Sequence, residues 1–233
     1  MYEYERWDRI LLLLREKQAA SVRELSEKLY ASEATIRRDL SALEQKGLIR
    51  RMRGGAALVD DATRELPLYM REMQQVEAKR IIAARAARHL QDGQIIFLDA
   101  SSTVMQLIPY LEARRHLTII TNGMKTAQEL SSLPHKTYCT GGLMLHNSSA
   151  YVGNYAADFV ANFNADLFFF SSRGVSDSGM ITDASSEETH IRQVMFAHSC
   201  KHIFLYDHTK IGKTFCYNLC SMKLCDDAVT DLI

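Results

Sequence analysis

The chain has 233 residues, of which 47% are hydrophobic and 24% charged, and its formal net charge is +0. This length fits one large domain or a small domain followed by a larger one, and the composition excludes a disordered protein. No run approaches the roughly 18 consecutive apolar residues of a membrane helix, and the acidic, mixed start is unlike a secretory signal peptide. We therefore expect a cytoplasmic protein without a membrane partner.

The neutral total conceals an uneven distribution of charge. Residues 1–58 carry 12 Lys and Arg against 9 Asp and Glu, whereas the remainder carries 16 against 19. Within 35–55, six basic side chains stand against two acidic ones. A basic module on a mildly acidic body predicts that only the first part of the chain binds a polyanion.

Residues 1–58 have the pattern of a winged helix-turn-helix. A first helix is predicted over 5–18, where apolar residues recur at helical spacing. A second helix begins after Ser21, which stands three residues before Glu24 as in a capping box. Ser32 is placed to cap a third helix.

The third helix is expected to end at Gly47, and two short strands around Gly54–Gly55 are expected to form the wing. The module is predicted to end at Leu58. A linker is predicted over 59–75, and a second domain over 76–233.

One face of the third helix is suited to a DNA groove. Ile36, Leu40 and Leu43 face the core, which leaves arginines and small hydroxyl residues outside. Arginine can bind guanine through two hydrogen bonds, and wing arginines can contact phosphates or the minor groove. A solvated basic face is the alternative, but the caps, helix lengths and basic wing all agree with DNA binding. The predicted DNA-binding residues are Ser32, Thr35, Arg37, Arg38, Ser41, Arg50, Arg51 and Arg53.

The remainder is predicted to be an open α/β domain. Five continuous apolar runs are each followed by Gly, Ser, Asn or Asp and then by a helix-like segment. The runs are QIIFLDA, LTIITNG, KTYCTGG, DLFFFSS and KHIFLYD. Runs without alternation indicate strands buried on both faces, and helices between them indicate a parallel sheet.

Polar loops follow these strands, at the sheet edge where open α/β domains bind ligands. Three hydroxyls within 101–103, at the start of a predicted helix, suit a phosphate, and the neighbouring charged groups suit a phosphorylated polyol. Each loop alone is weak evidence, because Ser and Thr also cap helices and paired glycines also make turns. Asp99 and Lys210 follow buried strands and need partners, so they could contact the ligand or could pair with each other. The candidate effector-binding residues are Asp99, Ser101, Ser102, Thr103, Thr121, Asn122, Gly141, Gly142, Arg173, Glu187 and Lys210.

The five cysteines form no CxxC pair, and the spacing of Cys216, Cys220 and Cys225 is poor for zinc. Reduced thiols are the expected state. We expect neither a metal nor a cofactor.

The run SEATIRRDLSALEQKGLIRRMRGGA closely resembles the recognition helix and wing of the DeoR family of bacterial transcriptional regulators. In that family these segments typically read S-x-x-T-I-R-R-D-L and R-x-x-G-G-A. Later segments, among them TNG, TGG, SSRGVSDSGMITDASSEETHIRQVM and the D-x-x-K of Asp207 and Lys210, resemble the family's sensor domain. The likeness covers essentially the whole chain. It departs at Ser101, where the phosphate loop D-x-G-[ST]-T commonly has glycine, and the family usually continues slightly past AVTDLI.

This resemblance implies a sensor domain similar in fold to ribose-5-phosphate isomerase that binds a phosphorylated sugar. It implies a repressor of a sugar-catabolism operon that binds a double-stranded DNA operator. A helix-turn-helix usually acts as a dimer, so a homodimer or homotetramer is expected, and no enzyme. One alternative is a sugar-phosphate isomerase-like enzyme, with Asp99, Glu187, Glu188 and Lys210 in acid, base and electrostatic roles. Another is a DNA-binding protein whose α/β domain only oligomerises.

Overall fold

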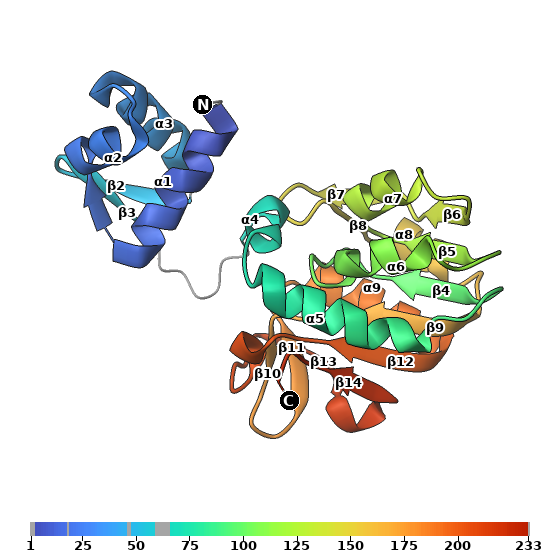
Figure 1. The fold of residues 1–233 in the computed structure, drawn as a ribbon. Helices are drawn as coiled ribbons and strands as arrows, with labels where there is room; N and C mark the ends of the chain where they lie inside the picture. Colours follow the sequence, from blue (N-terminus) through green and yellow to red (C-terminus); the bar gives the residue numbers. More distant parts are fainter. Residues whose placement is uncertain (1–2, 18, 46–47, 59–65, 233) are drawn as a thin grey trace. The chain divides into compact units, whose positions relative to one another are not determined.

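A computed structural model describes residues 3–17, 19–45, 48–58 and 66–232 (Figure 1). The chain divides into two compact units, Met1–Ala62 and Thr63–Ile233. Of the expected linker over 59–75, residues 59–65 lie outside the described residues. The segment 66–75 instead contains a short helix, α4 (Leu68–Glu72), whose Leu68 and Met70 are buried.

The smaller unit contains the three predicted helices, α1 (Glu3–Lys17), α2 (Val22–Leu29) and α3 (Glu33–Gln45). The capping box at the start of α2 is confirmed. The Ser21 hydroxyl accepts a hydrogen bond from the Glu24 amide, and the Glu24 carboxylate accepts one from the Ser21 amide at 2.9 Å. The predicted end of α3 at Gly47 lies outside the described residues. The buried side chains that hold the three helices together include Ile10, Leu14, Leu25, Ile36, Leu40 and Leu43.

The wing is an antiparallel sheet of three strands rather than the two predicted. It consists of β1 (Ala19–Ser21), β2 (Ile49–Met52) and β3 (Gly55–Leu58), in the order β1-β3-β2. A side chain at Gly55 would place its Cβ 2.3 Å from the carbonyl oxygen of Ala20. Glycine at this position therefore allows β1 to pair with the wing.

The turn between α2 and α3 contains a residue in an unusual conformation. Tyr30 has φ 50° and ψ 42°, in the left-handed region, and its side chain is 97% exposed. Its amide donates to the carbonyl of Ser26 and closes α2. Glycine is the usual residue in this conformation at a helix end, because a side chain there is strained.

The larger unit is built on a six-stranded sheet in which every neighbouring pair of strands is parallel, in the order β14-β12-β9-β4-β5-β6. The five strands expected from the apolar runs are confirmed, and the short edge strand β14 was not expected. The strands are β4 (Ile95–Leu98), β5 (Thr118–Thr121), β6 (Lys136–Cys139), β9 (Ala165–Phe170), β12 (Ser199–Leu205) and β14 (Asp227–Val229).

Helices cover both faces of this sheet (Figure 1). One face carries α5 (Val76–Ala86), α6 (Ile108–Leu111) and α7 (Met124–Leu130), and the other carries α8 (Asn154–Val160) and α9 (Ser186–Ala197). Successive residues of β9 point to opposite faces of the sheet. Phe169 therefore packs in the hydrophobic core beneath α5, α6 and α7, and Phe168 packs in the core beneath α8 and α9. This arrangement explains the unbroken apolar runs in the sequence.

The sequence predicted a helix-like segment after each of these strands, but the structure differs after β6 and after β9. After β6 the chain forms a hairpin of β7 (Leu143–Leu145) and β8 (Ala150–Val152). After β9 it enters a small antiparallel sheet of β10 (Gly174–Val175), β11 (Met180–Asp183) and β13 (Tyr217–Ser221). Four 3-10 turns complete the described part of the unit: η1 (Ala87–His89), η2 (Val104–Leu107), η3 (His208–Lys210) and η4 (Met222–Leu224).

Candidate DNA-binding surface and anion pocket

The start of α3 is held by two hydroxyl groups. The Ser32 oxygen accepts a hydrogen bond from the Thr35 amide at 3.2 Å, and the two hydroxyl oxygens lie 2.9 Å apart. Ser32 is thus the expected cap of α3. Thr35 is held beside it, next to the exposed face of the helix.

The predicted arginines differ in how firmly they are held. Arg37 forms an exposed ion pair with Glu33 at 3.1 Å, whereas Arg38 is exposed and has no ion pair within the described part of the chain. Arg51 of the wing donates to the Ser41 hydroxyl at 3.0 Å, and its amide donates to Glu44. The contacts of Arg51 fix the wing against α3.

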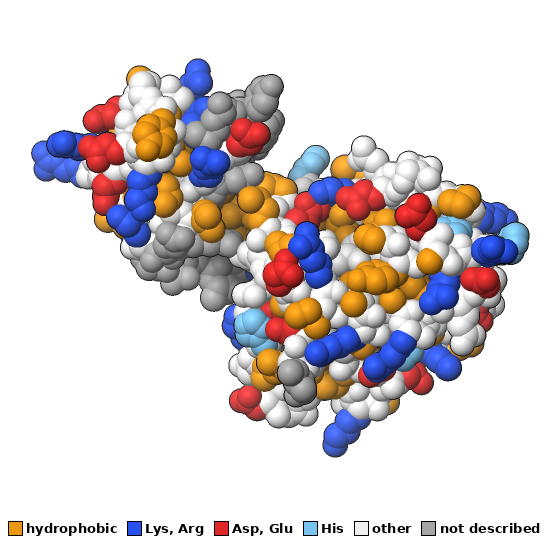
Figure 2. All heavy atoms as spheres, in the orientation of Figure 1, with side chains coloured by type: hydrophobic (Ala, Val, Ile, Leu, Met, Phe, Trp, Pro, Cys, Tyr) orange, Lys and Arg blue, Asp and Glu red, His pale blue; other side chains and the backbone are white. Residues whose placement is uncertain are grey.

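Arg50 and Arg53 are exposed on β2 and on the turn that follows it. Figure 2 shows Lys and Arg side chains projecting from the smaller unit, with Asp and Glu among them. All eight predicted DNA-binding residues therefore belong to one compact unit, on α3, its cap or the wing.

Asp39 has a role that sequence reasoning did not assign. Although it belongs to the basic helix, its side chain is fully buried and forms an ion pair with Arg6 of α1. The indole N–H of Trp7 donates to the same carboxylate at 3.0 Å. Asp39 thus fixes the orientation of α3 on α1, and with it the direction in which the exposed arginines point.

The larger unit has a pocket at the carboxyl ends of β4, β9 and β12. Five predicted effector residues line it, namely Ser101, Ser102, Thr103, Arg173 and Lys210. Eleven further lining residues are Leu66, Arg71, Gln74, Gln75, Lys79, Ser171, Ser172, Asp183, Arg192, Asp207 and Thr209.

Five basic residues line this pocket. Arg192 is held by buried carboxylates, and the other four are Arg71, Lys79, Arg173 and Lys210. Burial, together with the nearby charge of Lys210, lowers the pKa of Lys79 to about 8. Burial also lowers the pKa of Lys210, although Asp207 opposes that shift. Cations crowded in a partly desolvated site gain from an anion that enters it, so the arrangement favours a negatively charged ligand.

A buried ion network closes the bottom of the pocket. The Arg192 guanidinium donates to Asp99 at 2.8 Å and to Asp183 at 3.0 Å, and Glu188 lies 3.8 Å away. Burial opposes the charged form of Arg192, but the three carboxylates outweigh it and raise its pKa. Burial raises the pKa of Asp183 despite the neighbouring guanidinium.

Asp99 therefore pairs with Arg192, and not with Lys210 as the sequence had left open. Its carboxylate also accepts hydrogen bonds from the amides of Ser101 and Ser171, at 3.0 and 3.1 Å. These contacts join the loops after β4 and β9. Asp99 does not line the pocket itself, and its contacts place it as a support for the lining loops.

The loop after β4 differs from the expected helix start. Ser101, rather than Ser102 or Thr103, is the local cap, because its hydroxyl accepts the Val104 amide at 3.2 Å. The chain then forms η2 and the four-residue α6, which together offer little helix dipole. The backbone at Ser101 is not left-handed. Serine in the glycine position is therefore unstrained.

The other predicted effector residues lie outside the pocket, and several of them make local contacts. Thr121 accepts the Gly123 amide, and Asn122 donates to the carbonyl of Tyr151 at 3.1 Å. Gly141 and Gly142 have positive φ, and a Cβ at Gly142 would lie 2.8 Å from the Val152 carbonyl oxygen. Glu187 is exposed and accepts hydrogen bonds from the hydroxyls of Ser185 and Ser186.

Sequence reasoning missed Arg71, Lys79, Asp183 and Arg192. One signal was available for Lys79, which lies on the same helical face as Ile82, Ala83 and Ala86 and is buried with them. A lysine on an apolar face needs a partner. The remaining three come from segments without such a pattern.

Among the described residues, no group of three or more His, Cys, Asp or Glu side chains is placed to hold a metal ion. No helix in the described ranges has both the length and the apolar character needed to cross a bilayer.

Comparison with family models and curated proteins agrees with both units. Residues 6–62 match the DeoR-like helix-turn-helix domain, and residues 74–232 match the DeoR C-terminal sensor domain. The HTH-type transcriptional regulator GolR of Listeria innocua is 35% identical over 232 residues, which cover 99% of this chain and 91% of GolR. The lactose phosphotransferase system repressor of Staphylococcus epidermidis is 32% identical over 235 residues, covering 99% and 93% of the two chains.

Two solved structures resemble the fold at low sequence identity. The tetrameric eIF2B-beta2-delta2 complex from C. thermophilum matches 71% of this chain and 58% of that chain, with a TM-score of 0.50 and 12% identity. Ribose 5-phosphate isomerase A from Methanocaldococcus jannaschii matches 59% and 55% of the two chains, with a TM-score of 0.44 and 14% identity.

Proposed function

The chain belongs to the DeoR family of DNA-binding transcriptional regulators, and from this premise we propose that it is a repressor controlled by a phosphorylated sugar. The single observation that carries the proposal is the cluster of four cations that line the pocket in addition to the carboxylate-bound Arg192. Arg71, Lys79, Arg173 and Lys210 come from separate segments of the chain, yet all line one cavity.

The rest of the lining suits the other end of such a ligand. A phosphate suits the cations and the hydroxyl of Ser102, while carboxylates accept hydrogen bonds from sugar hydroxyls. Asp183 and Asp207 line the pocket and can take that part. A pocket with both kinds of group favours a phosphorylated polyol over a simple anion.

The smaller unit reads the operator. Arg38 carries base recognition in this proposal, because it is exposed and has no competing ion pair in the described residues. Arg50 and Arg53 contact backbone phosphates from the wing. Helix-turn-helix proteins bind paired half-sites as dimers, so the proposal includes a homodimer or homotetramer on double-stranded DNA in the cytoplasm.

The relatives are regulators, and we propose that the pocket binds its ligand without converting it. An isomerase would need an acid and a base facing the substrate. Of the four residues named for those roles, Lys210 lines the pocket, whereas Asp99 and Glu188 lie beside Arg192 and Glu187 is exposed outside the pocket. The charged residues that line the pocket also argue against the alternative in which the α/β domain only oligomerises.

The test has two steps. A thermal-shift screen compares sugar phosphates with the same sugars lacking phosphate, and we expect stabilisation only by the phosphorylated members. The operator is then selected from random duplexes by the protein itself, and binding is measured with and without the best ligand. A change of about 5- to 150-fold in operator affinity is expected for allosteric control. A flat screen, turnover of the ligand, or an unchanged affinity would each count against the proposal.

A further inference from the structure

We propose that α4 is the movable wall of the effector pocket and that Glu72 and Lys125 are positioning residues that hold it in place. This inference rests on the proposed function, because it concerns how the effector pocket is closed. Neither Glu72 nor Lys125 lines the pocket, so both act through α4.

The segment around α4 contributes much of the pocket. Leu66 and Arg71 line it, and Gln74 and Gln75 line it from the joint with α5. The same segment is the first described part of the larger unit after residues 59–65, which connect it to the smaller unit along the chain. Among the described parts of the pocket, this segment is therefore the nearest along the chain to the DNA-binding unit.

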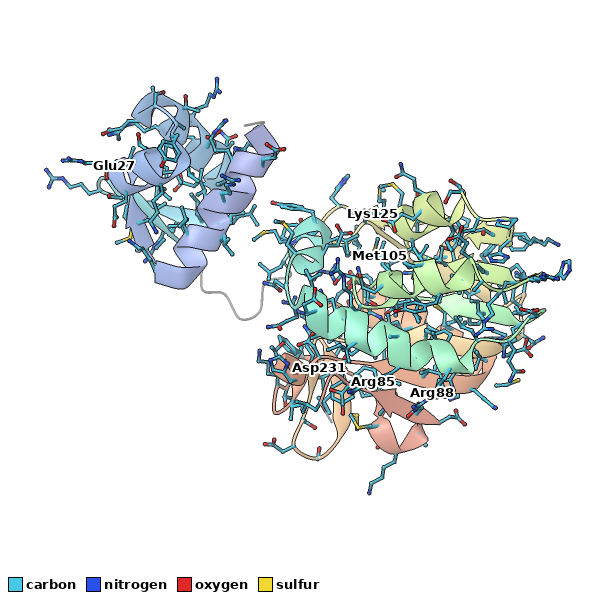
Figure 3. The ribbon with its side chains drawn as sticks, viewed as in Figure 1. Glu27, Arg85, Arg88, Met105, Lys125 and Asp231 are labelled. Atoms are coloured by element: carbon cyan, nitrogen blue, oxygen red, sulfur yellow. The ribbon has the colours of Figure 1, made fainter. Side chains whose placement is uncertain are left out.

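Polar contacts to three other segments hold α4 on the unit. The Leu68 amide donates to the carbonyl of Asn147 at 2.6 Å, in the turn between β7 and β8. The Glu72 carboxylate forms an ion pair with Lys125 of α7, which Figure 3 labels. From α5, the Lys79 ammonium donates to the Arg71 carbonyl at the end of α4.

Two features show that this position of α4 has a free-energy cost. Gln75, at the joint between α4 and α5, has φ 49° and offers no side-chain cap to α5. The Oε1 atom of Glu72 is buried without a hydrogen-bond partner among the described residues. A left-handed side-chain residue and an unpaired buried oxygen both disfavour the arrangement.

The contacts of Lys79 connect pocket occupancy to α4. Its ammonium donates to both the Arg71 carbonyl and the Ser102 hydroxyl. An anion bound by Lys79 and Arg71 adds attraction across the joint and favours the closed position of α4. A ligand shifts such an equilibrium only through its different affinity for the two states, and these contacts supply that difference.

The experiment uses the full chain with inorganic phosphate as the probe. Hydrogen exchange of the amides in 66–75 is measured with and without phosphate, and we expect slower exchange when phosphate is bound. The phosphate concentration for half-saturation is then measured for Lys125→Ala. We expect it to rise about two- to five-fold, as an ion pair of this exposure allows.

Arg80→Ala is the matched control, because it removes one partner of the exposed Glu77–Arg80 pair on α5, and neither residue lines the pocket. We expect its half-saturation to equal that of the wild type, even where its melting temperature falls as much as that of Lys125→Ala. Lys125→Arg keeps the charge and is expected to restore wild-type half-saturation. A purely structural role for Lys125 would change the melting temperature alone.

Two results would overturn the inference while leaving the proposed function intact. One is phosphate binding with unchanged exchange in 66–75. The other is equal half-saturation for Lys125→Ala and Arg80→Ala. Failure of the wild type to bind phosphate or any phosphorylated sugar would instead refute the proposed function, and this inference with it.

Discussion

The ammonium nitrogen of Lys79 lies 3.0 Å from the hydroxyl oxygen of Ser102, although the two residues are 23 positions apart in the chain. The same ammonium donates to the carbonyl of Arg71. One buried cation thus links three segments of the pocket wall, and several consequences can be measured.

The affinity for a phosphorylated ligand should fall as the pH rises through about 8, the pKa of Lys79 in the free protein. Only the protonated amine of Lys79 attracts the phosphate, so phosphate binding raises the pKa of Lys79. The contribution of Lys79 to the affinity is therefore complete below about pH 8 and is lost progressively above it. The lowered pKa of Lys210 acts in the same direction. Between pH 7 and 9 we expect Lys79 to cause a loss of up to about tenfold, measured by isothermal titration calorimetry.

Lys79→Arg is the control for this pH dependence, because a guanidinium stays charged throughout the range. The fall in affinity should become shallower in this variant, even if its affinity at pH 7 is lower. An equally steep fall in both proteins would exclude Lys79 as its source.

Arg38→Ala should weaken specific operator binding by about 5- to 150-fold, the range for losing a bidentate contact to guanine. Arg23→Ala is the matched control, since Arg23 is also an exposed arginine of the smaller unit but pairs with Glu27 on α2. Gel-shift titrations on operator and on unrelated duplex DNA measure both effects. Equal operator affinity for the two variants would show that α3 does not read bases through Arg38.

Asp39→Ala should destabilise the smaller unit by about 3–5 kcal/mol, because it removes the buried carboxylate that pairs with Arg6 and accepts a hydrogen bond from Trp7. Glu33→Ala, which breaks the exposed pair with Arg37, should cost about 0.5 kcal/mol or less. Urea denaturation followed by circular dichroism gives both values. Similar costs for the two variants would mean that burial adds nothing to the Asp39 pair.

Tyr30→Gly should stabilise the protein by about 1 kcal/mol, since glycine adopts the left-handed conformation without strain. The same change at Tyr155, an exposed residue of α8, should have the opposite effect by about 1 kcal/mol, because glycine weakens a helix. Thermal unfolding distinguishes the two signs. A lower stability for Tyr30→Gly would show that the tyrosine side chain offsets its own strain.

Local signals in the sequence were sufficient for most of the smaller unit. Ser21 with Glu24, and Ser32 with Thr35, form caps from residues three apart, so each cap could be recognised without knowing the fold. β1 was missed because three residues carry no periodic pattern, and the space left by Gly55 depends on a partner 35 positions earlier, at Ala20.

Only part of the pocket could be predicted, because some of its residues are placed by local sequence signals and others by distant packing. Residues that follow buried strands directly, such as Ser102 and Lys210, could be assigned to one edge of the sheet from the strands alone. Arg192 meets Asp99 across 93 positions, and its place depends on how α9 packs. Thr121 and Asn122 also follow a buried strand, but in the structure they form local hydrogen bonds instead of pocket contacts. The strand pattern alone does not predict this difference.

The chain contains a single tryptophan, Trp7, and its indole is hydrogen-bonded to Asp39 on the helix proposed to read DNA. Its fluorescence therefore reports on the smaller unit, whereas the pocket lies in the larger unit. A change in tryptophan emission on adding a sugar phosphate would show, without any added label, that ligand binding in the larger unit alters the environment of Trp7 in the smaller unit.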